Sequence, residues 1–198
     1  MLKPLLRSLT FRLRTWRRRV AMRWMFADKG TAAFFAMLAT PLIVLISIVH
    51  FAYTDQRRAR IAAAEQRAED LRCLAENIYY EARGEPLLGQ YAVAEVTLNR
   101  VASSDFPDTI CEVVHDSRWD RLHRRLTAHF SWTRLAVKHD APKGPAWEQA
   151  MVVAVAVYDR THKPIVPSAL FYHTSGVHPY WAESKRVVAK IGNHIFYR

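Results

Sequence analysis

The sequence predicts an α+β fold in which helices come first and a small antiparallel β-sheet comes last, with one transmembrane helix in front. Three observations carry this prediction. A run without a formally charged residue covers residues 31–53. Apolar residues recur at helical spacing over residues 73–101 and again over residues 147–159. Short β-branched and aromatic runs, separated by turn residues, close the chain after residue 168.

The first 30 residues carry most of the positive charge. They hold nine lysine or arginine residues and one aspartate, a net charge of +8 out of the formal +11 of the 198-residue chain. Leucine, tryptophan and valine recur in this tail every three or four residues, the pattern of a basic amphipathic helix on anionic lipid headgroups. A disordered positive tail that only orients the next helix would explain the charge equally well.

Residues 31–53 are predicted to form a transmembrane anchor. Thr31 to Val49 is uncharged, and at about 1.5 Å per residue it spans roughly the 30 Å hydrocarbon core of a bilayer. A cleaved signal peptide is the alternative, but the basic region is long, the apolar run exceeds a typical signal core and no Ala-x-Ala-like site follows closely. The positive tail predicts a cytoplasmic N-terminus and places the rest of the chain outside.

A helical stalk and a mixed set of short elements are predicted for the rest of the chain. Residues 54–71 are rich in Ala, Arg, Glu and Gln without Gly or Pro, which predicts a solvated helical stalk. A loop, a short helix and a long segment without sustained period follow the helices of residues 73–101, and the chain ends in a strand and a hairpin around Gly192-Asn193. The loop is expected at residues 103–108, the short helix at 109–115 and the segment without a sustained period at 116–145. A further helix is expected at 147–159, the strand at 169–173, and the two strands of the hairpin at 186–191 and 194–197.

Glu81 is the first candidate for chemistry. A stripe of apolar residues runs along its helix, and at 100° per residue Glu81 lies at the edge of that stripe. Gly84 then ends the helix, and Pro86 keeps the residue before it out of the α conformation. A carboxyl group at the edge of an apolar surface is partly desolvated, which raises its pKa toward the range of a general acid. A solvated surface glutamate is the alternative interpretation.

The motifs resemble those of the SleB-type cell wall hydrolases, the family of the spore cortex-lytic enzymes. The resemblance covers residues 72–198, which form the predicted hydrolase domain. It rests on strings that occur in the expected order: Asn77-Ile78-Tyr79-Tyr80-Glu81-Ala82-Arg83-Gly84-Glu85-Pro86, Gly89-Gln90, Ala92-Val93-Ala94, Asn99-Arg100-Val101, Phe106-Pro107-Asp108-Thr109-Ile110-Cys111, Phe130-Ser131-Trp132 and Ile191-Gly192-Asn193-His194-Ile195-Phe196-Tyr197.

The resemblance implies a lysozyme-like helical lobe and a single catalytic glutamate, Glu81. The enzymes of this family act on the β-1,4 bond between N-acetylmuramic acid and N-acetylglucosamine in peptidoglycan glycan strands. As in lytic transglycosylases, one carboxyl group could protonate the glycosidic oxygen and then take the proton of the muramic 6-hydroxyl as a 1,6-anhydro ring closes. That route differs from the usual pair of carboxylates in glycosidases. No cofactor is implied.

Glu85 is the possible second carboxylate, although the Gly84 and Pro86 around it favour a structural role at the helix break. Asn99 is assigned to the substrate site as a residue that orders it. Glu95 and Asn99, four residues apart, could instead face the site together or bond to each other. Aromatic faces and polar edges are expected to bind sugar. The candidates are Phe130, Ser131, Trp132, Tyr172, His173, Tyr180 and Trp181, with an ordinary core position as the alternative for each aromatic residue.

The two cysteines and nine histidines limit the other classes of site. Cys73 and Cys111 form no Cys-x-x-Cys motif and are expected to form a disulfide if the domain lies outside the cytoplasm. His173 and His178 lack the spacing of a zinc motif, so no metal site is expected. A pI near 10 is typical of nucleic-acid-binding proteins. In this chain the positive charge lies mainly in the tail, and the sequence contains no nucleic-acid-binding motif.

The sequence thus predicts a single-pass inner-membrane protein with a periplasmic domain that cuts peptidoglycan. Its expected partners are glycan strands, the inner membrane through residues 31–53 and anionic lipids through the tail; protein partners cannot be read from the sequence. A catalytically silent wall-binding or scaffold protein is the alternative from another class. A zinc-dependent amidase is a further alternative.

Overall fold

The computed structural model describes residues 29–120, 124–128, 130–134 and 142–198. The chain divides into two compact units, residues 1–61 and residues 62–198. The predicted basic tail lies outside the described residues except for its last two. Helix α2 (Lys29–Ala82) begins in the first unit and ends in the second.

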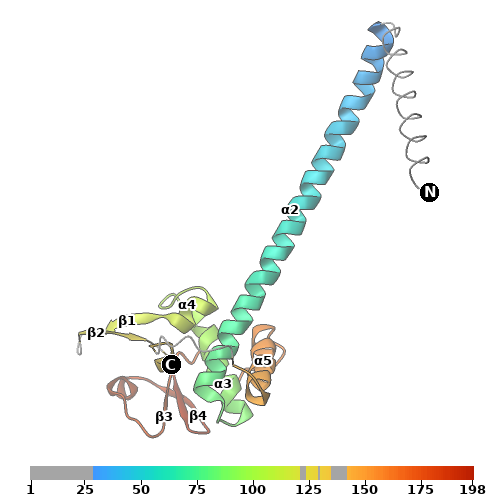
Figure 1. Ribbon diagram of the computed structural model, residues 1–198. Helices are drawn as coiled ribbons and strands as arrows, with labels where there is room; N and C mark the ends of the chain where they lie inside the picture. The colour runs from blue at the N-terminus through green and yellow to red at the C-terminus, as the bar shows by residue number, and fades with distance from the viewer. Residues whose placement is uncertain (1–28, 121–123, 129, 135–141) are drawn as a thin grey trace, which may run out of the picture. The chain divides into compact units, whose positions relative to one another are not determined.

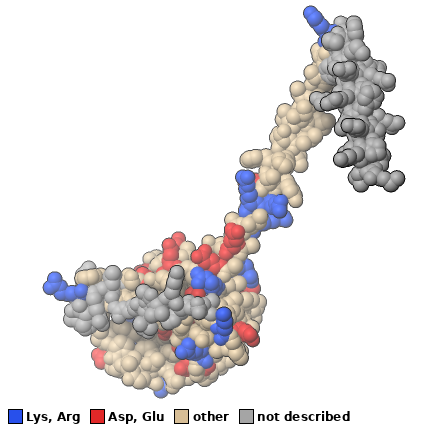
Figure 2. Space-filling model, in the orientation of Figure 1, with Lys and Arg blue, Asp and Glu red and all other residues tan. Residues whose placement is uncertain are grey.

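In the first unit, α2 is helical throughout the predicted anchor and continues through Pro41. Its large apolar side chains are exposed, and Met37 keeps 76% of its surface. Figure 2 shows this part of α2 as a band without charged atoms. The helix is long and apolar enough to cross a membrane, a property that it shares with signal sequences near an N-terminus. The predicted stalk, residues 54–71, is helical.

The second unit gathers three further helices around the end of α2. They are α3 (Leu87–Val101), α4 (Ile110–His115) and α5 (Pro145–Tyr158), and α3 and α5 lie side by side (Figure 1). Leu74 and Ile78 of α2 pack with Val153 of α5 in one buried cluster. The apolar stripe predicted on residues 74–82 is therefore the face that α2 buries in this core.

A three-stranded antiparallel sheet follows in the order β3-β5-β4. Its strands are β3 (Phe171–Thr174), β4 (Val187–Ile191) and β5 (His194–Tyr197). The β4–β5 turn contains Gly192 with φ +56°, a conformation that glycine adopts without strain. Phe196 of the central strand is fully buried and shares a second core cluster with Val93 and Val96 of α3. The predicted α+β class and the terminal hairpin are confirmed.

The sequence prediction missed a second hairpin inside residues 116–145. Strands β1 (Ser117–Asp120) and β2 (Arg125–Ala128) pair antiparallel, and a 3-10 helix η1 (Ser131–Arg134) follows. Each strand has only four residues. SRWD contains one apolar residue, and the alternation in RLTA is too short to mark a strand. Another 3-10 helix, η2 (Tyr180–Ser184), precedes β4 and was also not predicted.

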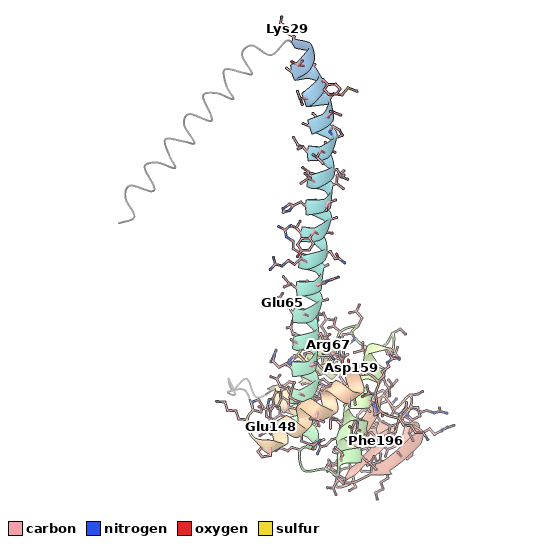
Figure 3. The ribbon with its side chains drawn as sticks, turned by 90° about the vertical axis from the view of Figure 1, so that its right-hand side faces the viewer. Lys29, Glu65, Arg67, Glu148, Asp159 and Phe196 are labelled. Carbon is pink, nitrogen blue, oxygen red and sulfur yellow. A yellow bond between two sulfur atoms is a disulfide. The ribbon has the colours of Figure 1, made fainter. Side chains whose placement is uncertain are left out.

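Among the residues that the structure describes, a disulfide and an ion pair attach α2 to its neighbours. The predicted disulfide is confirmed: Cys73 of α2 is bonded to Cys111 of α4. Arg67 donates to both carboxylate oxygens of Asp159, at the C-terminal end of α5, over 2.8 and 2.7 Å. Figure 3 labels this pair where α2 passes the end of α5. These contacts fix the last turns of α2, which carry Glu81, to the helical lobe.

Candidate active site

Glu81 lies in the last turn of α2, one residue before the helix ends. Its side chain is half-buried, and its Oε2 accepts a hydrogen bond of 3.2 Å from the hydroxyl of Tyr172 on β3. Burial raises the pKa of the Glu81 carboxyl, while the Tyr172 hydrogen bond and the positive charge of Arg100 partly oppose that rise. The group therefore keeps a proton to higher pH than an ordinary glutamate, as a general acid requires.

Tyr172 is held by aromatic rings on several sides. Its ring centroid lies 5.2 Å from that of His194 and 5.6 Å from that of Phe196, both on β5. Burial, and then the charge of Glu81, raises the pKa of the Tyr172 hydroxyl well above its usual value. The hydroxyl consequently stays protonated across the physiological range and serves Glu81 as a hydrogen-bond donor.

Arg100 brings a buried positive charge to the same region. It lies near the end of α3, and its Nε donates to the carbonyl of Leu170 over 2.8 Å, just before β3 begins. Its guanidinium lies over the rings of Phe106 and Phe130, at 5.2 and 5.1 Å from their centroids. Arg100 thus supports the start of the strand that carries Tyr172 and favours the ionised form of Glu81.

Glu85 is occupied by the turn between β4 and β5. Its Oε2 accepts from the backbone N–H of Asn193 over 2.8 Å, and its Oε1 accepts from the Asn193 side chain over 3.1 Å. The Nδ1 atom of His194 lies 3.8 Å from the same Oε1. Both carboxylate oxygens are therefore engaged within the protein, an arrangement that supports the structural role favoured by the sequence.

Glu95 and Asn99 hold one segment between α5 and β3. Glu95 accepts from the backbone N–H groups of Ile165 and Val166 and from His162, whose Nε2 is 2.6 Å away. Asn99 donates to the carbonyls of Val166 and Ala169 over 3.2 and 3.0 Å. The prediction that the two side chains might bond to each other is wrong. Asn99 acts on the segment that leads into β3, which is an ordering contact.

Two predicted sugar-binding residues belong to the core. Phe130 is 2% exposed and lies in the helical core cluster, so its ring offers no face to a substrate. His173 is also buried, with Nδ1 at 2.9 Å from the Thr174 carbonyl and Nε2 at 2.8 Å from the Tyr197 hydroxyl. Neither residue can bind sugar directly in this arrangement, because the surfaces that would do so are already covered.

The other aromatic candidates retain exposed surface. Trp132 is half-buried, stacks on Tyr80 with ring centroids 4.6 Å apart, and donates from Nε1 to Asn77. Tyr180 is 82% exposed on η2, whereas the neighbouring Trp181 is half-buried against the sheet. The side chain of Ser131 lies outside the described residues. Among the aromatic candidates, Tyr180 is therefore exposed, while Trp132 and Trp181 keep part of their surface open.

Tyr80, Arg100 and Asn193 lie in the motifs given above, but the sequence predicts no role for them. A signal existed for Arg100, because a charged residue in a largely apolar helix needs a partner where it is buried. No comparable signal existed for the stack of Tyr80 on Trp132, which are 52 positions apart. The two hydrogen bonds from Asn193 to Glu85 were likewise not predictable, because they depend on how the sheet packs against the α2–α3 turn.

His173 and His178 are the histidines considered above for a zinc site. The rings of His173 and His178 lie 6.4 Å apart, but both ring nitrogens of His173 are engaged as described above. Among the residues that the structure describes, no group of three or more His, Cys, Asp or Glu side chains is arranged to hold a metal ion.

Comparison with known proteins gives relatives of a single kind. Over 128 residues, 64% of this chain, it is 33% identical to a spore cortex-lytic enzyme of Bacillus cereus. The corresponding enzyme of Oceanobacillus iheyensis is 32% identical over 139 residues. The chain spans 43% and 41% of the length of these two relatives.

Two solved structures match the same part of the chain. The catalytic domain of the Bacillus cereus SleB protein superposes with a TM-score of 0.52 at 30% identity, covering 65% of this chain and 89% of that domain. The catalytic domain of the germination-specific lytic transglycosylase SleB from Bacillus anthracis gives the same score and identity, with 93% of that domain covered.

The family model described as cell wall hydrolase matches residues 84–197, more than half of the chain. The matched segment begins three residues after Glu81 and includes Glu85, Arg100, Tyr172 and Asn193. The family model, the curated relatives and the solved structures agree: the chain belongs to the SleB-type cell wall hydrolase family.

Proposed function

We propose that this protein is a peptidoglycan-cleaving enzyme that cuts glycan strands between N-acetylmuramic acid and N-acetylglucosamine. The observation that carries the proposal is the Glu81 carboxyl group, half-buried, with a raised pKa and a hydrogen bond from Tyr172. Membership of the cell wall hydrolase family supports the substrate class. The similar catalytic domain from Bacillus anthracis is that of a germination-specific lytic transglycosylase, which supports the type of reaction.

In the proposed reaction, Glu81 acts first as acid and then as base. Its proton passes to the glycosidic oxygen as the bond from that oxygen to C1 of muramic acid breaks. The Glu81 carboxylate then takes the proton of the 6-hydroxyl of the same sugar, whose oxygen bonds to C1 and closes a 1,6-anhydro ring. Intramolecular attack benefits from proximity and needs no second carboxylate.

The state of Glu85 supports the single-carboxyl route. A hydrolase of the usual kind needs a second carboxylate that is free to activate water or to attack the sugar. Asn193 occupies both oxygens of Glu85 with hydrogen bonds of 2.8 and 3.1 Å. A muramidase that releases reducing ends is the competing outcome.

We also propose that the domain works outside the cytoplasm, attached to the inner membrane by residues 31–53. The Cys73–Cys111 disulfide supports this, because disulfides persist in oxidising compartments such as the periplasm. The long apolar part of α2 is compatible with the anchor. The basic tail would then remain in the cytoplasm against anionic lipids.

The test is digestion of purified sacculi by the full chain in detergent, with products identified by mass. We expect anhydro-muropeptides, and we expect Glu81→Gln to reduce their formation at least about a hundredfold while folding and sacculus binding are retained. Glu148→Gln, which alters an exposed carboxylate on α5, is the matched control.

Each other result overturns a stated part of the proposal. Reducing ends would replace the transglycosylase by a muramidase, and free stem peptides would indicate an amidase. Binding without cleavage would identify a silent wall-binding protein. A Glu81→Gln variant that cleaves at the parental rate would show that another residue carries the chemistry.

A further inference from the structure

The two glutamates of the Glu81–Glu85 string contact the same β-sheet at different places. Glu81 accepts from Tyr172 on the edge strand β3. Glu85 accepts twice from Asn193 in the turn that precedes the central strand β5. Because β5 pairs with β3, with Tyr172 opposite Phe196, the position of β5 determines where the Tyr172 hydroxyl lies.

The turn fits closely around Glu85. A Cβ atom added to Gly192 would overlap Oε2 of Glu85 and would lie 2.9 Å from Cδ of Pro86. The positive φ of Gly192 also disfavours any side chain there. The backbone of the turn can therefore approach the carboxylate only because residue 192 lacks a side chain.

A buried path leads from this contact to the acid. His194, the first residue of β5, is 3% exposed in its side chain and lies beside Glu85, while its ring meets the ring of Tyr172 edge-on at 5.2 Å. Tyr172 in turn donates to Glu81. Close-packed rings transmit a displacement to their neighbours, so a shift of the turn moves Tyr172.

We propose that Glu85 is a positioning residue: by holding the β4–β5 turn it sets the hydroxyl of Tyr172 against the carboxyl of Glu81. Glu85 acts through His194 and Tyr172 and does not touch substrate. This inference rests on the proposed function, since it assigns Glu85 a part in making Glu81 an effective acid.

Conservative and disruptive variants separate positioning from direct catalysis. Glu85→Gln retains an oxygen for the Asn193 backbone N–H, and a turned Asn193 amide can accept from the new NH2 group. We expect it to keep activity within about tenfold of the parent. Glu85→Ala removes both acceptors and should lower kcat roughly 10- to 100-fold, the range expected for a displacement of about 1 Å at an active site.

Gly192→Ala disrupts the same contact while leaving the carboxylate in place. We expect its loss of kcat to resemble that of Glu85→Ala. The Tyr172→Phe variant removes only the hydroxyl at the other end of the path. Combining Glu85→Ala with Tyr172→Phe should cost clearly less than the product of the two separate losses, because both changes break the same interaction.

A measurement without turnover separates this inference from the proposed function. Carbon-13 NMR follows the titration of the Glu81 carboxyl. Relative to the parent, the titration curve should be displaced in the same direction in Glu85→Ala, Gly192→Ala and Tyr172→Phe. It should be unchanged in the control Glu148→Gln. The inference is overturned if Glu85→Gln is as inactive as Glu81→Gln while Gly192→Ala retains activity. It is also overturned if the Glu81 titration moves in Tyr172→Phe alone. Absence of cleavage by the parent would instead contradict the proposed function.

Discussion

At the scale of single residues, the burial that would make Glu81 a general acid also costs stability at neutral pH. Burial raises the pKa of its carboxyl above the ordinary value of 4.5, so the folded protein binds this proton more tightly than the unfolded chain does. The contribution of the group to stability is then fully present below the unfolded pKa. It is lost as the pH rises through the folded pKa, where a partly buried carboxylate must carry its charge.

Replacing Glu81 by Gln should consequently stabilise the fold at neutral pH. Glutamine keeps an oxygen that can accept from Tyr172 and has no charge to desolvate. The gain in unfolding free energy over the parent should be absent near pH 4 and should increase through the folded pKa, by roughly 1.4 kcal/mol for each unit by which that pKa is raised. Chemical denaturation of the two proteins across this pH range measures it.

Glu148→Gln serves as the control for losing a carboxylate that is exposed. A Glu81→Gln variant less stable than its parent at neutral pH would contradict the burial argument. That result would mean that the carboxylate form of Glu81 is stabilised by its surroundings, in which case Arg100 outweighs desolvation.

The parts of the candidate site that depend on local sequence could be predicted. Glu81 at the edge of an apolar stripe, Gly84 as a helix breaker and the turn at Gly192-Asn193 follow from spacing and backbone preference. The partner of Glu81 does not, because Tyr172 comes from a strand 91 positions away. Phe130 was wrongly assigned to sugar binding since an aromatic residue in an irregular segment looks the same whether it faces the core or solvent.

At the scale of secondary-structure elements, the Cys73–Cys111 disulfide should contribute strongly to stability. It joins α2 to α4 across 38 positions, and closing a loop of that length removes about 4 kcal/mol of unfolded-state entropy in the chain-entropy treatment. Replacing both cysteines by serine should lower the unfolding free energy by about that amount. In thermal melts, the parent under reducing conditions should show a Tm lowered to about that of the double serine variant.

Thiol labelling of the denatured, unreduced parent is the companion measurement. It should detect no reactive thiol among the two cysteines. Two labelled thiols per chain, together with a serine variant as stable as the parent, would contradict a stabilising disulfide.

The long helices and the terminal hairpin were predicted because each has a periodic pattern or a turn signal over enough residues. Helix α5 starts at Pro145, slightly before the predicted range, since proline is well accepted in a first turn. Strands β1 and β2 were missed because four residues offer too few positions to reveal a period. Their pairing is a tertiary property of the chain.

At the scale of the whole molecule, the distribution of charge predicts its orientation in a membrane. With +8 in the first 30 residues, that segment should remain in the cytoplasm. An exported reporter that is active only outside the cytoplasm should work when fused after Arg198 and fail when fused after Asp28. Activity of the second fusion alone would place the domain away from peptidoglycan and contradict the proposed function.

The short distance in sequence between Glu81 and Glu85 has an evolutionary consequence. One inserted residue before Gly84 would turn the positions after it by about 100° relative to Glu81, as long as the helix continued. The Asn193 contact and the Tyr172 contact could then not form together. We therefore expect descendants of this chain to inherit the string from Glu81 to Glu85 without insertions or deletions.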